Sequence, residues 1–141
     1  MRLRQARAAL LHIFRYWFDN VVGSSQLIAS EGALRRKWVQ KETGITSAYD
    51  PDELFEQLLG DLRLKDEVQR FKDDLIQLGA FDALNALTSA LIEAEGLVRG
   101  DARFADPQTL LTSPEWAAVR HAAGGVIRLP AAKALKQEPP A

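Results

Sequence analysis

Hydrophobic side chains recur every three or four positions along most of this chain, which is the spacing of one face of an α-helix. The first series predicts a long helix over residues 2–21 that ends at Gly23. A second helix is predicted to begin with Ser24 or Ser25 as its N-cap and to end at Gly44. The apolar positions of the two series are Leu3, Leu10, Phe14, Trp17 and Val21, then Leu27, Ile28, Leu34 and Trp38.

Three dipeptides combine a helix-capping side chain with a proline, which favours the first helical position. They are Asp50-Pro51, Asp106-Pro107 and Ser113-Pro114. The first predicts a helix that ends or bends at Gly60, with Leu54 and Leu58 on its buried side. The second predicts a short turn over residues 107–112. The third predicts a helix that carries Trp116 and Val119 and is interrupted at Gly124-Gly125.

Two more helices fill the middle of the chain. One is predicted to end at Gly79, and the next extends from Phe81 to Gly100. A last turn is predicted from Pro130 through Leu135. Their apolar positions are Val68, Phe71, Leu75 and Leu78, then Phe81, Leu84, Leu87, Leu91 and Val98.

Composition supports a helical fold throughout. Alanine (21) and leucine (20) far outnumber isoleucine (6) and valine (7), which favours helix over strand. The 141 residues, 47% of them hydrophobic, fit one domain with its own core. We therefore predict an all-α fold: a single domain over residues 1–135, built as an irregular bundle of about five main helices with short additional helical turns near the C-terminus. Residues 136–141 are predicted to be disordered.

The chain has no cysteine, so disulfides and thiolate metal sites are excluded and a reducing compartment, the cytoplasm, is expected. His12 and Arg15 interrupt the apolar run near the N-terminus, which argues against a signal peptide. No stretch reaches the roughly 18 consecutive apolar residues that a membrane span needs. These observations predict a soluble protein.

Charge is segregated along the sequence. Residues 1–47 hold eight basic side chains against three acidic ones, whereas residues 48–74 hold nine acidic against four basic. On a helical wheel three acids of the second block, Asp52, Glu53 and Glu56, lie opposite Leu54 and Leu58, so these carboxylates stay in water. They predict an acidic docking surface for a basic protein; the alternative is an ordinary solvated helix face. The predicted surface comprises Tyr49, Asp52, Glu53, Glu56 and Asp61.

In general make-up the chain resembles small helical immunity proteins. That resemblance rests on composition and implies an inhibitor that neutralises a basic toxin, such as a nuclease domain, by noncovalent binding. A toxin that acts on nucleic acid is basic because it binds phosphate. We therefore expect an immunity or antitoxin-type function, and a secretion or assembly chaperone would have the same sequence features.

The arginines of the first predicted helix suggest a different function. Arg4, Arg7 and Arg15 lie within about 80° of one another on the helical wheel, and Arg35 and Arg36 could extend the patch. Such a basic amphipathic helix could contact nucleic acid or an anionic membrane surface. Alternatively these arginines pair with the acidic block inside the fold, which would leave less of that block free for a partner.

Catalytic signals are sparse. The separation of Arg7 and His12 is similar to the arginine–histidine signature of HEPN-type ribonucleases, which implies cleavage of RNA. The pair departs from that family by lying in the first predicted helix and by the alanine that follows Arg7. Neither His12 nor His121 has an acid three or four positions away, and no nucleotide-binding loop is present. We expect no metal, no cofactor and no enzymatic activity.

Overall fold

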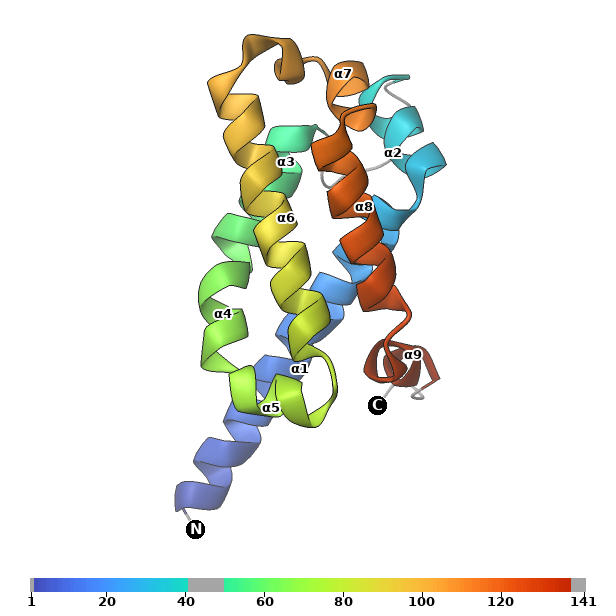
Figure 1. Cartoon of the computed structure of the whole chain (residues 1–141). Coiled ribbons are helices and arrows are strands. Elements are labelled where there is room, and N and C mark those ends of the chain that lie inside the picture. The colour runs from blue at the N-terminus through green and yellow to red at the C-terminus, as the bar shows by residue number, and fades with distance from the viewer. Residues whose placement is uncertain (1, 41–49, 138–141) are drawn as a thin grey trace.

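The computed structural model describes residues 2–40 and 50–137, with the backbone alone described for residues 2–10 and 135–137. The described chain is helical and contains no strand, which confirms the all-α prediction (Figure 1). The elements are α1 (Arg2–Ala29), α2 (Glu31–Trp38), α3 (Pro51–Phe55), the π-helical η1 (Glu56–Asp61), α4 (Leu64–Arg70), α5 (Lys72–Gln77), α6 (Phe81–Gly100), the 3-10 helix η2 (Ala102–Ala105), α7 (Pro107–Leu111), α8 (Pro114–Ile127) and α9 (Pro130–Gln137).

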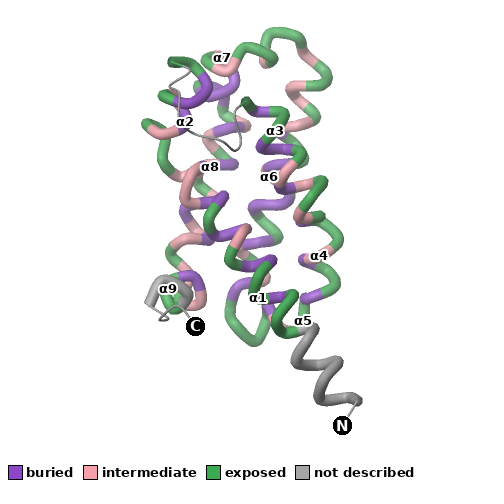
Figure 2. The backbone as a smooth tube through the Cα atoms, turned by 180° about the vertical axis from the view of Figure 1, so that it is seen from behind, coloured by how far each residue is buried: buried purple, intermediate pink, exposed green. Residues whose placement is uncertain are grey.

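The long helices α1, α6 and α8 form the frame of the bundle. α8 packs against both α6 and α1, while α4 and α5 lie against α6. Buried residues gather on the sides of these helices that face one another (Figure 2). The three tryptophans are buried as predicted: Trp17 joins the aromatic rings of Phe14 and Phe71, and Trp38 meets Trp116 edge to face at 5.3 Å.

The first helix is longer than predicted. It continues through Gly23 to Ala29, so Ser24 and Ser25 lie inside the helix and do not cap the next one. Both serines are buried, and the Ser25 hydroxyl donates to the Val21 carbonyl at 2.8 Å. Packing against the core therefore outweighs the helix-breaking tendency of the glycine. The actual N-cap of α2 is Ser30, whose side chain accepts a hydrogen bond from the Ala33 amide.

The helix that begins at Asp50-Pro51 has the predicted cap, because the Asp50 carboxylate accepts from the Glu53 amide at 2.8 Å. It then widens into η1, so Gly60 lies inside a π-helical turn. The next helix ends at Gly79, which has a φ of 69°, as predicted. Its break at Phe71, which separates α4 from α5, was not predicted.

The two N-caps predicted in the C-terminal part of the chain are confirmed. Asp106 and Ser113 accept hydrogen bonds from backbone amides at the starts of α7 and α8. The predicted interruption at Gly124-Gly125 is wrong, since α8 passes through both glycines. Gly124 is buried, and a Cβ there would lie 3.1 Å from the Arg128 guanidinium. The helix therefore uses a glycine to make room for an arginine. α9 extends to Gln137, two residues into the predicted tail.

Candidate functional site

The segment α3–η1 has a hollow on each side. One is an open groove of about 790 Å³ between α3–η1 and the C-terminal part of α6. The other is a pocket of about 470 Å³ between α1, α2 and α3–η1. The helical period of α3–η1 explains the division, because Phe55 and Glu56 turn to the groove while Leu54 and Gln57 turn to the pocket.

The first hollow, which we call the acidic groove, combines carboxylates with an apolar wall. Asp52 and Glu56 are exposed and come from consecutive turns of α3–η1, and Glu95 reaches the groove from α6. Leu59 and Val98, both half-buried, supply the apolar surface between them, and Phe55 lies buried at the base of the groove. The groove therefore offers both charge and hydrophobic contact to a partner.

Most of the negative charge in the acidic groove is not neutralised by the described residues. Glu95 pairs with Arg99 at 3.3 Å, and Arg99 lines the groove as well. Asp52 and Glu56 form no ion pair with any residue whose side chain is described, in the ranges 11–40 and 50–134. Their carboxylates keep their hydration, so they act through a long-range field and cost little stability.

Only part of the predicted docking surface converges on this groove. Asp61 is exposed at the end of η1 but does not line it. Glu53 is exposed on α3, and it acts electrostatically on Lys37, which lines the pocket on the other side of the helix. Tyr49 lies outside the described residues. Glu95 was missed by the sequence analysis, since it is distant in sequence and only the packing of α6 brings it to the groove.

The basic residues do not assemble into one surface where their side chains are described. Arg15 lines a shallow apolar hollow where α1 meets α9. Arg35 instead lies within 3.8 Å of Glu31 and contacts the Gln108 side chain of α7. In Figure 1, α2 and α7 lie together at one end of the bundle and α9 lies at the other end. Arg36 is exposed on α2, and the side chains of Arg4 and Arg7 lie outside the described residues.

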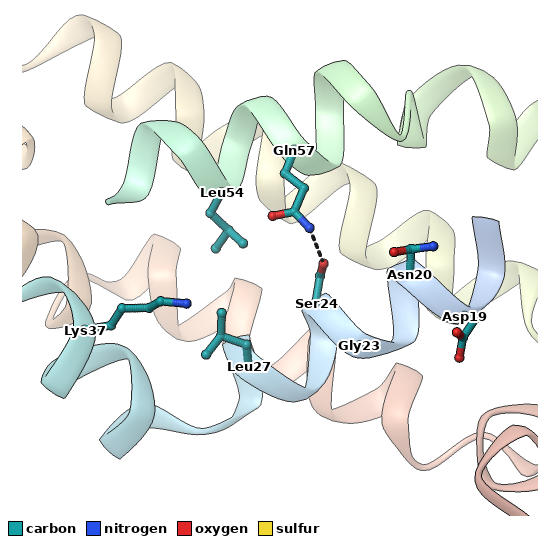
Figure 3. A pocket seen from close by; sticks show the side chains of 8 residues that line it. All are labelled: Asp19, Asn20, Gly23, Ser24, Leu27, Lys37, Leu54 and Gln57. Atoms are coloured by element: carbon teal, nitrogen blue, oxygen red, sulfur yellow. Dashed lines mark hydrogen bonds between the residues drawn. The ribbon is translucent and has the colours of Figure 1, made fainter. Parts of the chain in front are cut away.

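The second hollow, which we call the Lys37 pocket, contains a buried cation. Figure 3 shows the Lys37 side chain extending from α2 toward the space between Leu27 and Leu54. Lys37 is only 2% exposed. Asp19, Asn20, Gly23, Ser24 and Gln57 complete the lining. Across the pocket, the Gln57 amide donates to the Ser24 hydroxyl at 3.4 Å.

The Lys37 ammonium has no close partner among the described residues, which give it neither a hydrogen bond nor an ion pair within 4 Å. Burial lowers the pKa of Lys37 from its ordinary value, and the negative charge of Glu53 opposes that shift. The sequence analysis did not single out Lys37, which directly follows Arg35 and Arg36 in the chain. No local signal separates a buried lysine from its exposed neighbours.

The described part of the chain also bears on three other features: a metal site, grouped histidines and a membrane-spanning helix. It contains no group of three histidine or acidic residues that could hold a metal ion. His12 and His121 are both exposed, and the geometry of the Arg7–His12 pair lies outside the described side chains. None of the described helices has the length and hydrophobicity required to cross a bilayer.

Comparison with known proteins adds no family to this description. No protein-family model, no curated protein and no solved structure matches the chain.

Proposed function

We propose that this protein is a noncovalent binding domain whose acidic groove receives a basic segment of a protein partner. The observation that carries the proposal is the pair of exposed carboxylates, Asp52 and Glu56, which lack an ion-pair partner among the described residues. Beside them lies the half-buried apolar surface of Leu59 and Val98. Acids next to an apolar strip complement a basic amphipathic helix or loop.

Toxin neutralisation is the form of this function that we favour. An inhibitor that covers a basic nuclease or similar toxin needs a negative field to accelerate association and no catalytic groups of its own. A cysteine-free chain is consistent with action in the cytoplasm. The same groove would serve a secretion or assembly chaperone, which also holds a partner without chemistry.

The alternative of a nucleic-acid or membrane-surface adaptor has weaker support. It requires the basic side chains to act together, and Arg15 and Arg35 lie toward different ends of the bundle. We therefore rank the adaptor function below the binding of a basic partner in the acidic groove.

Affinity capture followed by kinetics tests the proposal. The full chain captures its partner from a lysate of the source organism at low and high salt, and the captured protein is then purified. We expect Asp52→Asn with Glu56→Gln to slow association and flatten its salt dependence. Co-expression would show whether the chain relieves toxicity of the captured protein.

Asp73→Asn with Glu93→Gln is the matched control, because it removes the same two charges from exposed positions outside the groove. Equal association rates for the groove variant and the unaltered chain would contradict the proposal. A captured partner that is not basic would contradict it as well.

A further inference from the structure

Lys37 is the one charged residue among the buried residues of the described structure. Its side chain is almost fully buried and points into a pocket, yet no described residue supplies a counter-ion within 4 Å. We propose that the Lys37 pocket is a binding site for a small organic monocarboxylate, whose carboxylate pairs with the Lys37 ammonium. This site is separate from the acidic groove and does not depend on the function proposed for it.

The energetic argument starts from desolvation. An ammonium group that leaves water loses its hydration free energy, and only a nearby negative charge or hydrogen-bond acceptor compensates for that loss. A methionine or leucine at this position would fill the same space without the penalty. A buried, unpaired lysine beside a cavity is therefore typical of a binding site, where a ligand supplies the missing partner.

The charges around the pocket favour a ligand with a single negative charge. Glu53 of α3 acts on Lys37 without pairing closely with it, and Asp19 of α1 lines the opposite part of the pocket. One carboxylate neutralises the ammonium, whereas a second negative charge would find no further cation in the described lining of the pocket and would be repelled by Asp19. Phosphate and dicarboxylates are therefore disfavoured.

The remaining lining favours a short, partly polar carbon chain. The bond between Gln57 and Ser24 is long at 3.4 Å, so a ligand hydroxyl can replace it at little cost. The Asn20 amide nitrogen is already used by the Tyr16 carbonyl, which leaves its oxygen as an acceptor. Leu27 and Leu54 offer apolar contact, and about 470 Å³ is ample for such a molecule.

Nuclear magnetic resonance on the isotope-labelled full chain tests the site with named probes. The first probe is β-hydroxybutyrate, and the matched probes are its uncharged amide and inorganic phosphate. We expect the carboxylate to shift the signals of Asn20, Ser24 and Gln57 and to raise the pKa of Lys37, because an adjacent anion favours the charged form. The amide and phosphate should bind at least roughly tenfold more weakly.

The substitution Lys37→Met should weaken β-hydroxybutyrate binding by roughly tenfold or more. Lys65→Met, at an exposed position on α4, is the control and should leave binding unchanged. If Lys37→Met fails to fold, the pKa of Lys37 is measured in the unaltered chain with and without β-hydroxybutyrate, and a raised pKa supports the proposal. The proposal is overturned if no probe shifts the pocket signals, if the amide or phosphate binds as tightly as the carboxylate, or if binding leaves the Lys37 titration unchanged.

Discussion

The two hollows beside α3–η1 differ in the sign of their charged side chains and in how far those side chains are exposed to water. In the acidic groove, Asp52 and Glu56 stand in water, so their charge costs little and acts over a distance. In the Lys37 pocket the lysine side chain is 2% exposed and desolvation lowers its pKa, so its charge lowers stability unless a ligand compensates it. The comparison shows that burial, more than the sign of the charge, decides how each site can act.

A single helical segment serves both hollows. Leu54 and Gln57 line the Lys37 pocket, Phe55 and Glu56 line the acidic groove, and Leu58 is fully buried between them. The charges can therefore be altered separately, whereas damage to the shared core of the segment affects both sites.

The largest effect is expected from Leu58→Ala, which removes the shared support. Loss of a fully buried leucine should lower the free energy of unfolding by about 3 kcal/mol. Urea denaturation measures that loss, and binding at both hollows should weaken together. Leu78→Ala is the control at a 42% exposed position and should cost less than about 1 kcal/mol. Loss of binding at only one hollow would show that the two sites do not share this support.

Lys37→Met should have the next largest effect and should increase stability. Removing the desolvated charge is expected to raise the free energy of unfolding by about 1 kcal/mol near neutral pH, the low end for such a change because Glu53 partly offsets the penalty. Chemical denaturation at several pH values measures the difference between the variant and the unaltered chain.

The pH dependence follows from the lowered pKa of Lys37. Between that lowered value and 10.5 the unfolded chain binds more protons than the folded chain, so the stability of the unaltered protein rises with pH across this window. The advantage of Lys37→Met is therefore full below the window and shrinks as the pH approaches 10.5. An advantage that grows with pH would contradict the assignment of Lys37 as a buried, unpaired cation.

Sequence periodicity predicted part of the exposed site and none of the buried one. The helical wheel placed Asp52 and Glu56 opposite Leu54 and Leu58, and the structure agrees, because that relation is local to one helix. Glu95 could not be assigned to the groove, since its position depends on how α6 packs. Lys37 was missed for the same reason, because α1 and α3 create its pocket.

Local signals also decided which helix boundaries were predicted correctly. Asp50, Asp106 and Ser113 cap their helices by side-chain bonds to nearby amides, so sequence identified them. Gly23 and Gly124 indicated helix ends that do not exist, because long-range packing sustains α1 and α8 through them. Among the described glycines, Gly79 and Gly100 mark helix ends, where capping geometry supports them, whereas Gly44 lies outside the described residues.

A smaller effect is expected from Gly60→Ala, which alters the acidic groove without altering its charge. A Cβ at this position would make ordinary contact with Glu56 at 3.6 Å, and alanine favours helix, so stability should rise by about 0.5 kcal/mol. Thermal unfolding measures the gain, and the titration of Lys37 should be unchanged. A loss of stability would show that the π-helical turn requires glycine.

The smallest effect on stability is expected from Glu56→Gln. Glu56 is exposed, lies beyond the first turn of α3 and has no ion pair among the described residues, so the free energy of unfolding should change by less than about 0.3 kcal/mol. Urea denaturation at low and high salt measures it, with Glu93→Gln as the control. A change above about 1 kcal/mol would mean that contacts within the fold hold this carboxylate. The acidic groove would then lack the freely hydrated charge that makes it differ from the Lys37 pocket.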